Sequence, residues 1–240
     1  MLSDFSLLFF LMKTSLVQQP NASPAWPGDF HLHTILCGHA EGLPAEYRDT
    51  ARKKGIRTIC FSDHMPSFGG YNTPHRMPPE HFSRYLDMVR ALQDKAEPRV
   101  LLGIEADYYE GCEATIRRFT GEHPFDLVIG SIHLLGEWVF DDPAERHRWD
   151  TVDVGKTWQR YFALLTRLAR SGLYDSIGHL DIPKKFGHRI EEALLREIAA
   201  PALDAAAAKN MAIEINTSGL RRPAQEQYPS RLILQMMRER

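Results

Sequence analysis

The chain has 240 residues, of which 43% are hydrophobic and 25% are charged, and its formal net charge is −2. This composition is typical of one globular α/β domain, and it argues against a protein that binds nucleic acid or an anionic membrane through its overall charge. The three cysteines, Cys37, Cys60 and Cys112, are widely spaced and form no CxxC pair, so we expect free thiols and a cytoplasmic protein.

The first 27 residues differ from the rest of the chain. Residues 5–12 (FSLLFFLM) are apolar but too short to span a bilayer, and no basic residue precedes them as in an export signal. Residues 18–27 are rich in Pro, Asn and Ser, which is typical of a linker. We therefore expect residues 1–27 to be a disordered extension, with Met12 as the more natural start, and residues 28–240 to form the domain.

From residue 29 onward, short apolar runs alternate with amphipathic helical runs. The six predicted strands are rich in Ile, Val, Leu and Phe, as buried parallel strands are. They end near His33, His64, Asp107, His133, His179 and Asn216. The predicted helices between them cover residues 44–54, 79–96, 112–122, 156–171 and 190–209. Six strands alternating with helices predict a βα barrel or a doubly wound sheet.

Proline and glycine mark the ends of the predicted helices. Pro44 lies in a first helical turn, where proline is tolerated, and Gly172 lies where a helix ends. Two long loops, 65–78 and 134–155, hold no predicted element. We expect His75, in the first of them, to be a solvated surface residue rather than a contact for substrate. In a barrel, loops that follow strands form the face that binds ligands.

Side chains that bind metals lie at the carboxyl ends of the predicted strands. His31 and His33 alternate along the first strand, so both point to the same face and can share one metal ion. The next four strands end in Asp63-His64, Glu105 with Asp107, His133, and His179 with Asp181. A single such histidine is more often a packing residue, but five successive strands predict a metal centre. Imidazole and carboxylate together suit zinc, iron or manganese better than magnesium or calcium.

The same residues carry a resemblance to a known family. The motifs are DFHLHT (29–34), CGHA (37–40), FSDHMP (61–66), GIEADY (103–108), GSIH (130–133), GHLDIPKKFG (178–187) and EINTSGLRRP (214–223). In this order they resemble the polymerase-and-histidinol-phosphatase (PHP) superfamily, and within it the histidinol-phosphate phosphatase branch, from about residue 28 to the last residue. The resemblance implies a distorted, TIM-like (β/α)7 barrel that holds two or three clustered divalent metal ions.

The resemblance also implies roles for single residues. The implied metal ligands are His31, His33, His39, His64, Glu105, His133 and His179. Glu105 would bridge two ions, and His39 would bind a third ion or only support its loop. Asp63 and Asp181 would orient imidazoles. The predicted catalytic residues are Glu105, His133 and Asp181.

Basic residues after the fifth and sixth strands are candidates to bind a phosphate. They are Lys184 and Lys185 after the fifth strand, and Arg221 and Arg222 after the sixth. The planar fork of arginine suits this task, and the resemblance favours Arg221. The predicted substrate-binding residues are Arg221, Asn216 and Lys184. For each basic residue the alternative is an ordinary solvated loop charge.

The function predicted from this pattern is that of a metal-dependent phosphomonoester hydrolase. Clustered metal ions lower the pKa of bound water and stabilise charge on phosphoryl oxygens. The resemblance implies a histidinol-phosphate phosphatase of histidine biosynthesis, which acts on a small phosphate ester, with no nucleic acid or membrane as partner. The alternatives are a related phosphoesterase that acts on nucleotides or oligonucleotides, and a catalytically silent homologue.

One part of the family's pattern is missing from the sequence. The family ends its barrel with a seventh strand that carries an Asp and a His, and no Asp-x-His follows residue 216 here. Two ligands and the closing strand are therefore absent. We expect the sequence to be a fragment of a longer protein rather than a shortened homologue with a damaged site.

Overall fold

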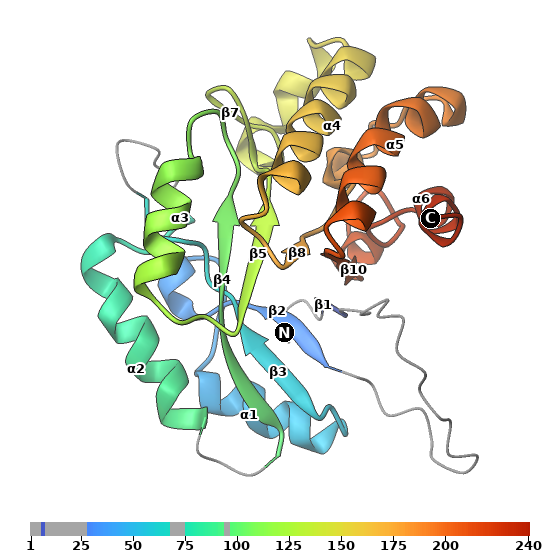
Figure 1. Cartoon of the computed structure of the whole chain (residues 1–240). Helices are drawn as coiled ribbons and strands as arrows, with labels where there is room; N and C mark the ends of the chain where they lie inside the picture. The colour runs from blue at the N-terminus through green and yellow to red at the C-terminus, as the bar shows by residue number, and fades with distance from the viewer. Residues whose placement is uncertain (1–5, 8–27, 68–74, 94–96) are drawn as a thin grey trace.

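The computed structural model describes residues 6–7, 28–67, 75–93 and 97–240. Its main sheet has six strands, each parallel to its neighbours and paired in chain order, β2-β3-β4-β5-β8-β9. The strands are β2 (Asp29–Leu32), β3 (Thr58–Phe61), β4 (Arg99–Asp107), β5 (Leu127–Ser131), β8 (Ser176–Ile177) and β9 (Ala212–Ile213). The sheet curls into a half barrel (Figure 1), which confirms the predicted TIM-like α/β class.

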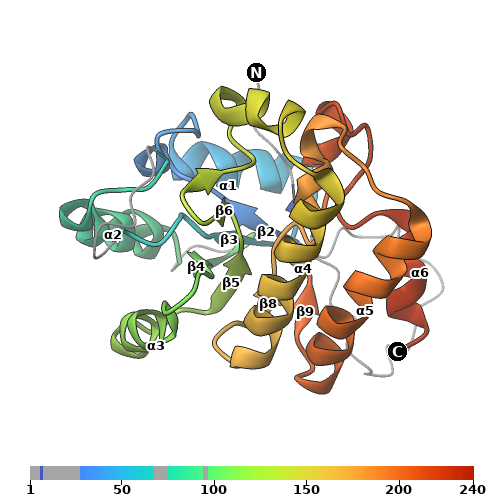
Figure 2. The same cartoon turned by 90° about the horizontal axis from the view of Figure 1, so that it is seen from above.

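The helices lie outside the curved sheet, as the view from above shows (Figure 2). They are α1 (Pro44–Lys53), α2 (Phe82–Gln93), α3 (Glu113–Glu122), α4 (Val154–Ser171), α5 (Glu192–Ala208) and α6 (Arg231–Arg238). The first five match the predicted helices within a few residues. Pro44 occupies the first turn of α1, and Gly172 ends α4 in the left-handed region at φ 66°.

The core lies between the sheet and the inner faces of the helices. All five residues of β5 are buried, because helices and loops cover both faces of a parallel strand. From α2, the buried Tyr85 hydroxyl lies 2.7 Å from the carbonyl oxygens of Phe61 in β3 and Gly103 in β4. This contact ties the helix to two neighbouring strands. The three cysteines are buried and unpaired, as predicted.

Short 3-10 helices follow several strands and shape the ligand-binding face. They are η1 (Ile35–Cys37), η2 (Pro79–His81), η3 (Pro143–Asp150), η4 (Ile182–Phe186) and η5 (Ser218–Arg221). Each of these segments turns the chain within a few residues. Side chains that are neighbours in sequence within such a turn therefore face different directions.

The loop 134–155 is more ordered than the sequence predicts. It contains a hairpin of β6 (Leu134–Leu135) and β7 (Trp138–Val139), followed by η3. Gly136 turns the hairpin at φ 73°, a conformation that favours glycine. Strands of two residues carry no detectable alternation, so periodicity could not reveal them.

Two residues of the predicted N-terminal extension form a short strand. Ser6–Leu7 form β1, which pairs antiparallel with β10 (Ile215–Asn216). The disorder expected for residues 1–27 stays a prediction. Residues 1–5 and 8–27, with the predicted linker and Met12, lie outside the described residues.

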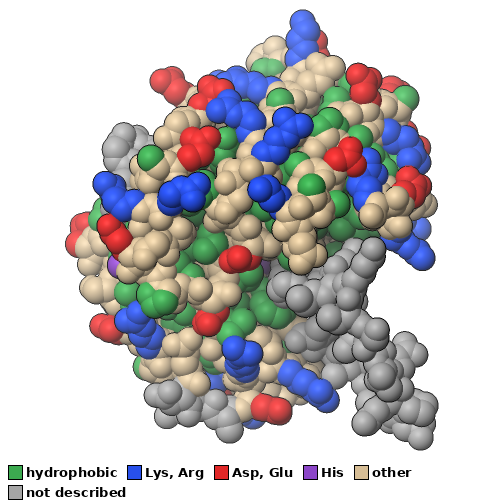
Figure 3. Space-filling view, in the orientation of Figure 1, with side chains coloured by type: hydrophobic (Ala, Val, Ile, Leu, Met, Phe, Trp, Pro, Cys, Tyr) green, Lys and Arg blue, Asp and Glu red, His purple; other side chains and the backbone are tan. Residues whose placement is uncertain are grey.

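The surface carries charges of both signs. Figure 3 shows one face, on which Lys and Arg side chains are interspersed with Asp and Glu. Among the helices of the described residues, none is long and apolar enough to cross a membrane. The cytoplasmic location and the absence of a nucleic-acid partner stay predictions.

Candidate metal centre

The carboxyl ends of the strands meet around the side chain of Glu105. Glu105 lies near the carboxyl end of β4, two residues before its last residue, and is 1% exposed. Its Oε2 is close to three imidazole nitrogens, those of His31 (Nε2, 3.1 Å), His33 (Nε2, 3.4 Å) and His64 (Nδ1, 2.9 Å). Its Oε1 is close to two more, those of His179 (Nε2, 3.2 Å) and His133 (Nε2, 3.6 Å). The two oxygens of one carboxylate thus face different sets of imidazoles.

His39, after η1, adds a further imidazole at the exposed side of the cluster. Its ring lies 4.7 Å from that of His33 and 5.3 Å from that of His64. Three groups of predicted ligands have ligand atoms within 4.8 Å of one another: His31 with Glu105 and His179, His64 with Glu105 and His133, and His33 with His39 and His64. All seven predicted metal ligands therefore lie in one cluster.

Burial and neighbouring charges together set the pKa values in the cluster. Burial lowers the pKa of His33, His64 and His133, so that these imidazoles stay neutral at pH 7. Burial would also lower the pKa of His31, but the carboxylates of Glu214 and Glu105 outweigh it and raise that pKa well above its usual value. Burial alone would raise the pKa of Glu105, but the surrounding imidazoles, above all His64, His31 and His133, outweigh it and hold that pKa well below its usual value. Neutral imidazole and ionised carboxylate are the forms that bind a metal ion.

Glu214, which sequence reasoning missed, contacts the imidazole of His31 and the backbone of His179. Its Oε1 lies 2.7 Å from His31 Nδ1, and its Oε2 accepts a hydrogen bond of 2.6 Å from the backbone N–H of His179. Asn216 Nδ2 also donates to Glu214 Oε1 at 3.2 Å. A carboxylate on one ring nitrogen fixes the tautomer, so the other nitrogen stays available for a metal ion. The available signal was a charged residue between two isoleucines in a buried strand.

Asp107 does the same for His133. Its Oδ1 lies 2.6 Å from His133 Nδ1, and its Oδ2 forms an ion pair with Arg76. Asp107 is two residues after Glu105 on β4, so both carboxylates point to the same face of the sheet. Arg76 was not predicted, because it lies in a loop without periodicity.

The position of Asp63 corrects its predicted role. Its two oxygens accept hydrogen bonds of 2.5 Å from Thr34 N and Thr34 Oγ1, whereas Oδ1 is 4.0 Å from His33 Nδ1. Burial raises the pKa of Asp63 to about 6. The nearer neighbour of His33 Nδ1 is Cys37 Sγ at 3.3 Å. Asp63 therefore mainly holds the turn after β2 and does not bind an imidazole directly.

Two further predictions, for Asp181 and Lys184, need correction. Asp181 is fully buried, and its Oδ2 accepts hydrogen bonds from Lys184 Nζ (2.8 Å) and Ser230 N (2.9 Å) rather than from an imidazole of the described chain. Lys184 Nζ also donates to Glu226 Oε2 (3.1 Å) and Gln227 O (2.7 Å), and its side chain is 1% exposed. Asp181 directly precedes the 3-10 turn η4 and Lys184 lies within it, and neither residue lines the cavity over the candidate metal centre. Among the described residues, the hydrogen-bond partners of these two side chains are each other, Ser230, Glu226 and Gln227, so the predicted contacts with an imidazole or with substrate are not seen.

A cavity of about 330 Å³ opens over the cluster. The clustered imidazoles and Glu105 line its base, and its walls include His75, Arg76, Asp141, Lys185, Asn216 and Arg222. Asn216 is therefore placed as predicted, whereas the exposed Arg221 is not among the lining residues and its neighbour Arg222 is. His75 also lines the cavity, with its Nε2 3.5 Å from Asp142 Oδ2, and its side chain stays partly exposed, so the expectation that it is a solvated residue rather than a contact for substrate stays a prediction.

The wall of this cavity carries one well-formed ion pair. Lys185 Nζ donates to Asp141 Oδ2 at 3.0 Å and to the Asp141 carbonyl oxygen at 2.6 Å. Burial would raise the pKa of Asp141, but the ammonium of Lys185 outweighs it and lowers that pKa. The ion pair thus holds the ammonium of Lys185, which comes from η4, at the wall of the cavity.

The donor set fits divalent metal ions. A buried carboxylate lies within 3.6 Å of five imidazole nitrogens, and carboxylates bind the far sides of His31 and His133. Oxygen and nitrogen donors of this kind suit zinc, iron or manganese. An orphaned ring nitrogen, His179 Nδ1, is buried without a hydrogen-bond partner among the described residues.

A half barrel with a histidine and carboxylate centre at the carboxyl ends of its strands defines a metal-dependent hydrolase of the barrel class. The family model of the PHP domain matches residues 29–218. The chain belongs to the PHP domain family.

Curated relatives and solved structures agree with this assignment. A probable histidinol-phosphatase of Deinococcus radiodurans is 42% identical over 214 residues, 88% of this chain and 81% of that protein. A structure of the Lactococcus lactis histidinol phosphate phosphatase, complexed with zinc, L-histidinol and phosphate, aligns with a TM-score of 0.72 and 27% identity over 88% of this chain and 81% of that one. A histidinol phosphatase structure from Listeria monocytogenes shares the fold, with a TM-score of 0.79 and 20% identity over 89% of this chain and 90% of that one.

Proposed function

We propose that this chain is a metal-dependent phosphomonoesterase that hydrolyses L-histidinol phosphate to L-histidinol and phosphate in histidine biosynthesis. The observation that carries the proposal is the single carboxylate of Glu105 among five imidazoles at the base of a cavity whose walls include Lys185 and Arg222. The 42% identity with the Deinococcus radiodurans relative supports the choice of substrate.

The proposed metal ligands fall into three groups around Glu105. His31 and His179 would hold one ion with this carboxylate, and His64 and His133 a second. His33 and His39 would hold a third ion, with His64 as a further ligand only if it does not bind the second, because a neutral imidazole binds one ion. We take zinc as the first candidate, because the Lactococcus lactis structure contains it, with iron and manganese as alternatives. When bound, such ions supply Lewis acidity and lower the pKa of a coordinated water.

The chain's own residues hold the ligands and position the substrate. Asp107 keeps the proton of His133 on Nδ1, so that Nε2 stays unprotonated toward Glu105. Lys185 and Arg222 line the wall above the centre, where their charges would bind phosphoryl oxygens. Asn216 lines the same wall and offers a side-chain amide to the substrate. A cavity of about 330 Å³ suits a small phosphate ester.

The test combines metal content with turnover. The purified chain, loaded with zinc or with manganese, is assayed for phosphate release from L-histidinol phosphate and from nucleoside monophosphates. We expect bound metal and a preference for L-histidinol phosphate. Turnover of nucleotides alone would refute the substrate, and bound metal without turnover of any ester would favour a silent homologue. A chain that binds no metal would refute the metal centre.

A further inference from the structure

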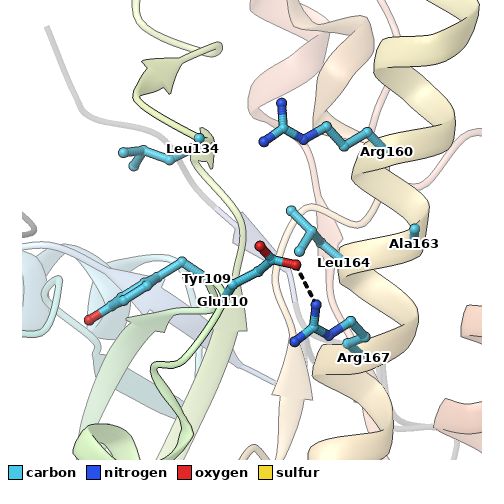
Figure 4. Close-up of a pocket in the computed structure, with 8 residues that line it drawn as sticks. Tyr109, Glu110, Leu134, Arg160, Ala163, Leu164 and Arg167 are labelled. Atoms are coloured by element: carbon cyan, nitrogen blue, oxygen red, sulfur yellow. Dashed lines mark hydrogen bonds and ion pairs between the residues drawn. The ribbon is translucent and has the colours of Figure 1, made fainter.

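A second cavity of about 330 Å³ lies between α4 and the connections that follow β4 and β5 (Figure 4). Its floor is apolar and consists of Leu134, Ala163 and Leu164, whereas its rim carries the charged side chains of Glu110, Arg160 and Arg167. Its volume lies at the lower end of the range of small-molecule sites. None of these residues takes part in the proposed reaction.

The two arginines of the rim are differently engaged. They are seven residues apart on α4, about two helical turns, and Figure 4 shows both side chains extending from this helix toward the cavity. Arg167 Nη1 pairs with Glu110 Oε1 at 2.6 Å. Arg160 forms no ion pair with any described residue. Two guanidinium groups and one carboxylate leave the rim with a net charge of +1.

Because Gly136 has no side chain, the Arg160 guanidinium can lie close to its backbone. A Cβ built on this residue would lie 3.2 Å from Arg160 Nη2, a closer approach than most real contacts of Cβ atoms. Gly136 is also the turn residue of the hairpin β6–β7, at φ 73°. The guanidinium therefore lies against the hairpin backbone, at the edge of an apolar floor.

We propose that this cavity is a second ligand site, which binds a small monocarboxylate with an apolar body. The carboxylate would accept two parallel hydrogen bonds from Arg160, whose planar fork matches it. Its single negative charge balances the net charge of the rim. The apolar body would cover Leu134 and Leu164, which removes hydrophobic surface from water.

This site adjoins the metal centre along the chain. Leu134 directly follows His133, and Tyr109, which also lines the cavity, comes two residues after Asp107. Asp107 and His133 are joined by the hydrogen bond of 2.6 Å. A ligand that contacts Leu134 and Tyr109 therefore contacts residues next to this pair in the chain, and occupancy is expected to change the turnover of the phosphate ester.

The probe for the site is phenylacetate, with the uncharged phenylacetamide as its matched control. Binding is measured by calorimetry on the metal-loaded chain saturated with inorganic phosphate, so that a carboxylate cannot compete at the metal centre. We expect Arg160→Gln to weaken phenylacetate binding about ten- to hundredfold, the effect of losing a charged pair of hydrogen bonds. Arg170→Gln, exposed on α4 but outside the cavity, should leave binding unchanged.

A second variant tests the apolar floor without removing charge. Ala163 is exposed on α4, so Ala163→Leu should fold normally while it fills the cavity and weakens binding. Equal binding by wild type and Arg160→Gln, equal binding of acid and amide, or no binding by the wild type at about ten millimolar probe would each overturn the site. Binding with no change in turnover would overturn the coupling to the metal centre.

Discussion

Replacement of Lys184 by methionine tests the buried ion pair beneath the metal centre. Lys184 Nζ lies 2.8 Å from Asp181 Oδ2, and the two side chains are 1% and 0% exposed. At an effective dielectric constant of about 20, unit charges at this distance attract by about 6 kcal/mol, part of which offsets their desolvation. Removing one partner leaves a buried charge. We therefore expect Lys184→Met to lower the free energy of unfolding by about 3–5 kcal/mol.

The loss should depend on pH in a defined direction. Burial already raises the pKa of Asp181, and without the ammonium that pKa rises further. A carboxyl group whose folded pKa exceeds its unfolded value of about 3.9 destabilises the fold above that pH, and the effect vanishes below it. The deficit of Lys184→Met should therefore shrink as the pH falls from about 8 to about 5.

Urea denaturation of the metal-free protein measures both effects. The double variant Lys184→Met with Asp181→Asn removes the buried charge and should recover most of the lost stability. Lys156→Met, which breaks an exposed pair with Asp153, is the matched control and should change little. A deficit of less than about 1 kcal/mol for Lys184→Met, or a double variant no more stable than the single one, would refute the reasoning.

Four further variants address the centre and the cavity above it. Glu105→Gln should abolish turnover of L-histidinol phosphate with an unchanged circular dichroism spectrum, because it removes the carboxylate that faces five imidazoles; retained turnover would exclude Glu105 from the centre. Glu214→Gln should weaken metal affinity about ten- to hundredfold, measured by competition with a chromophoric chelator, and unchanged affinity would contradict its orienting role. Arg222→Ala should raise KM about tenfold with less effect on kcat, and Arg221→Ala should change KM less; the opposite order would reinstate Arg221.

The clustering of most candidate metal ligands could be predicted, because it depends on where the strands end. Parallel strands bring their carboxyl ends to one edge, so His64, Glu105, His133 and His179 converge once the strands are identified. Alternation along β2 places the side chain of His31 on the face that bears the cluster. No knowledge of loops was needed for these residues.

The remaining residues depend on loop geometry. Lys184 and Lys185 are adjacent in sequence, yet one is buried against Asp181 and the other lines the cavity, because η4 turns them apart. Similarly, the family resemblance favours Arg221, the last residue of η5, whereas it is Arg222, the residue after it, that lines the cavity. Short 3-10 turns have no sequence periodicity that fixes which side chain points inward.

The hairpin β6–β7 and the residues just after it contribute to two cavities. Leu134 and Gly136 line the cavity beside α4, while Val139, Asp141 and Asp142 line the one over the metal centre. A single insertion or loop exchange between residues 134 and 143 would therefore alter both at once. A sequence change in this segment, natural or engineered, would therefore alter substrate preference and the cavity beside α4 together.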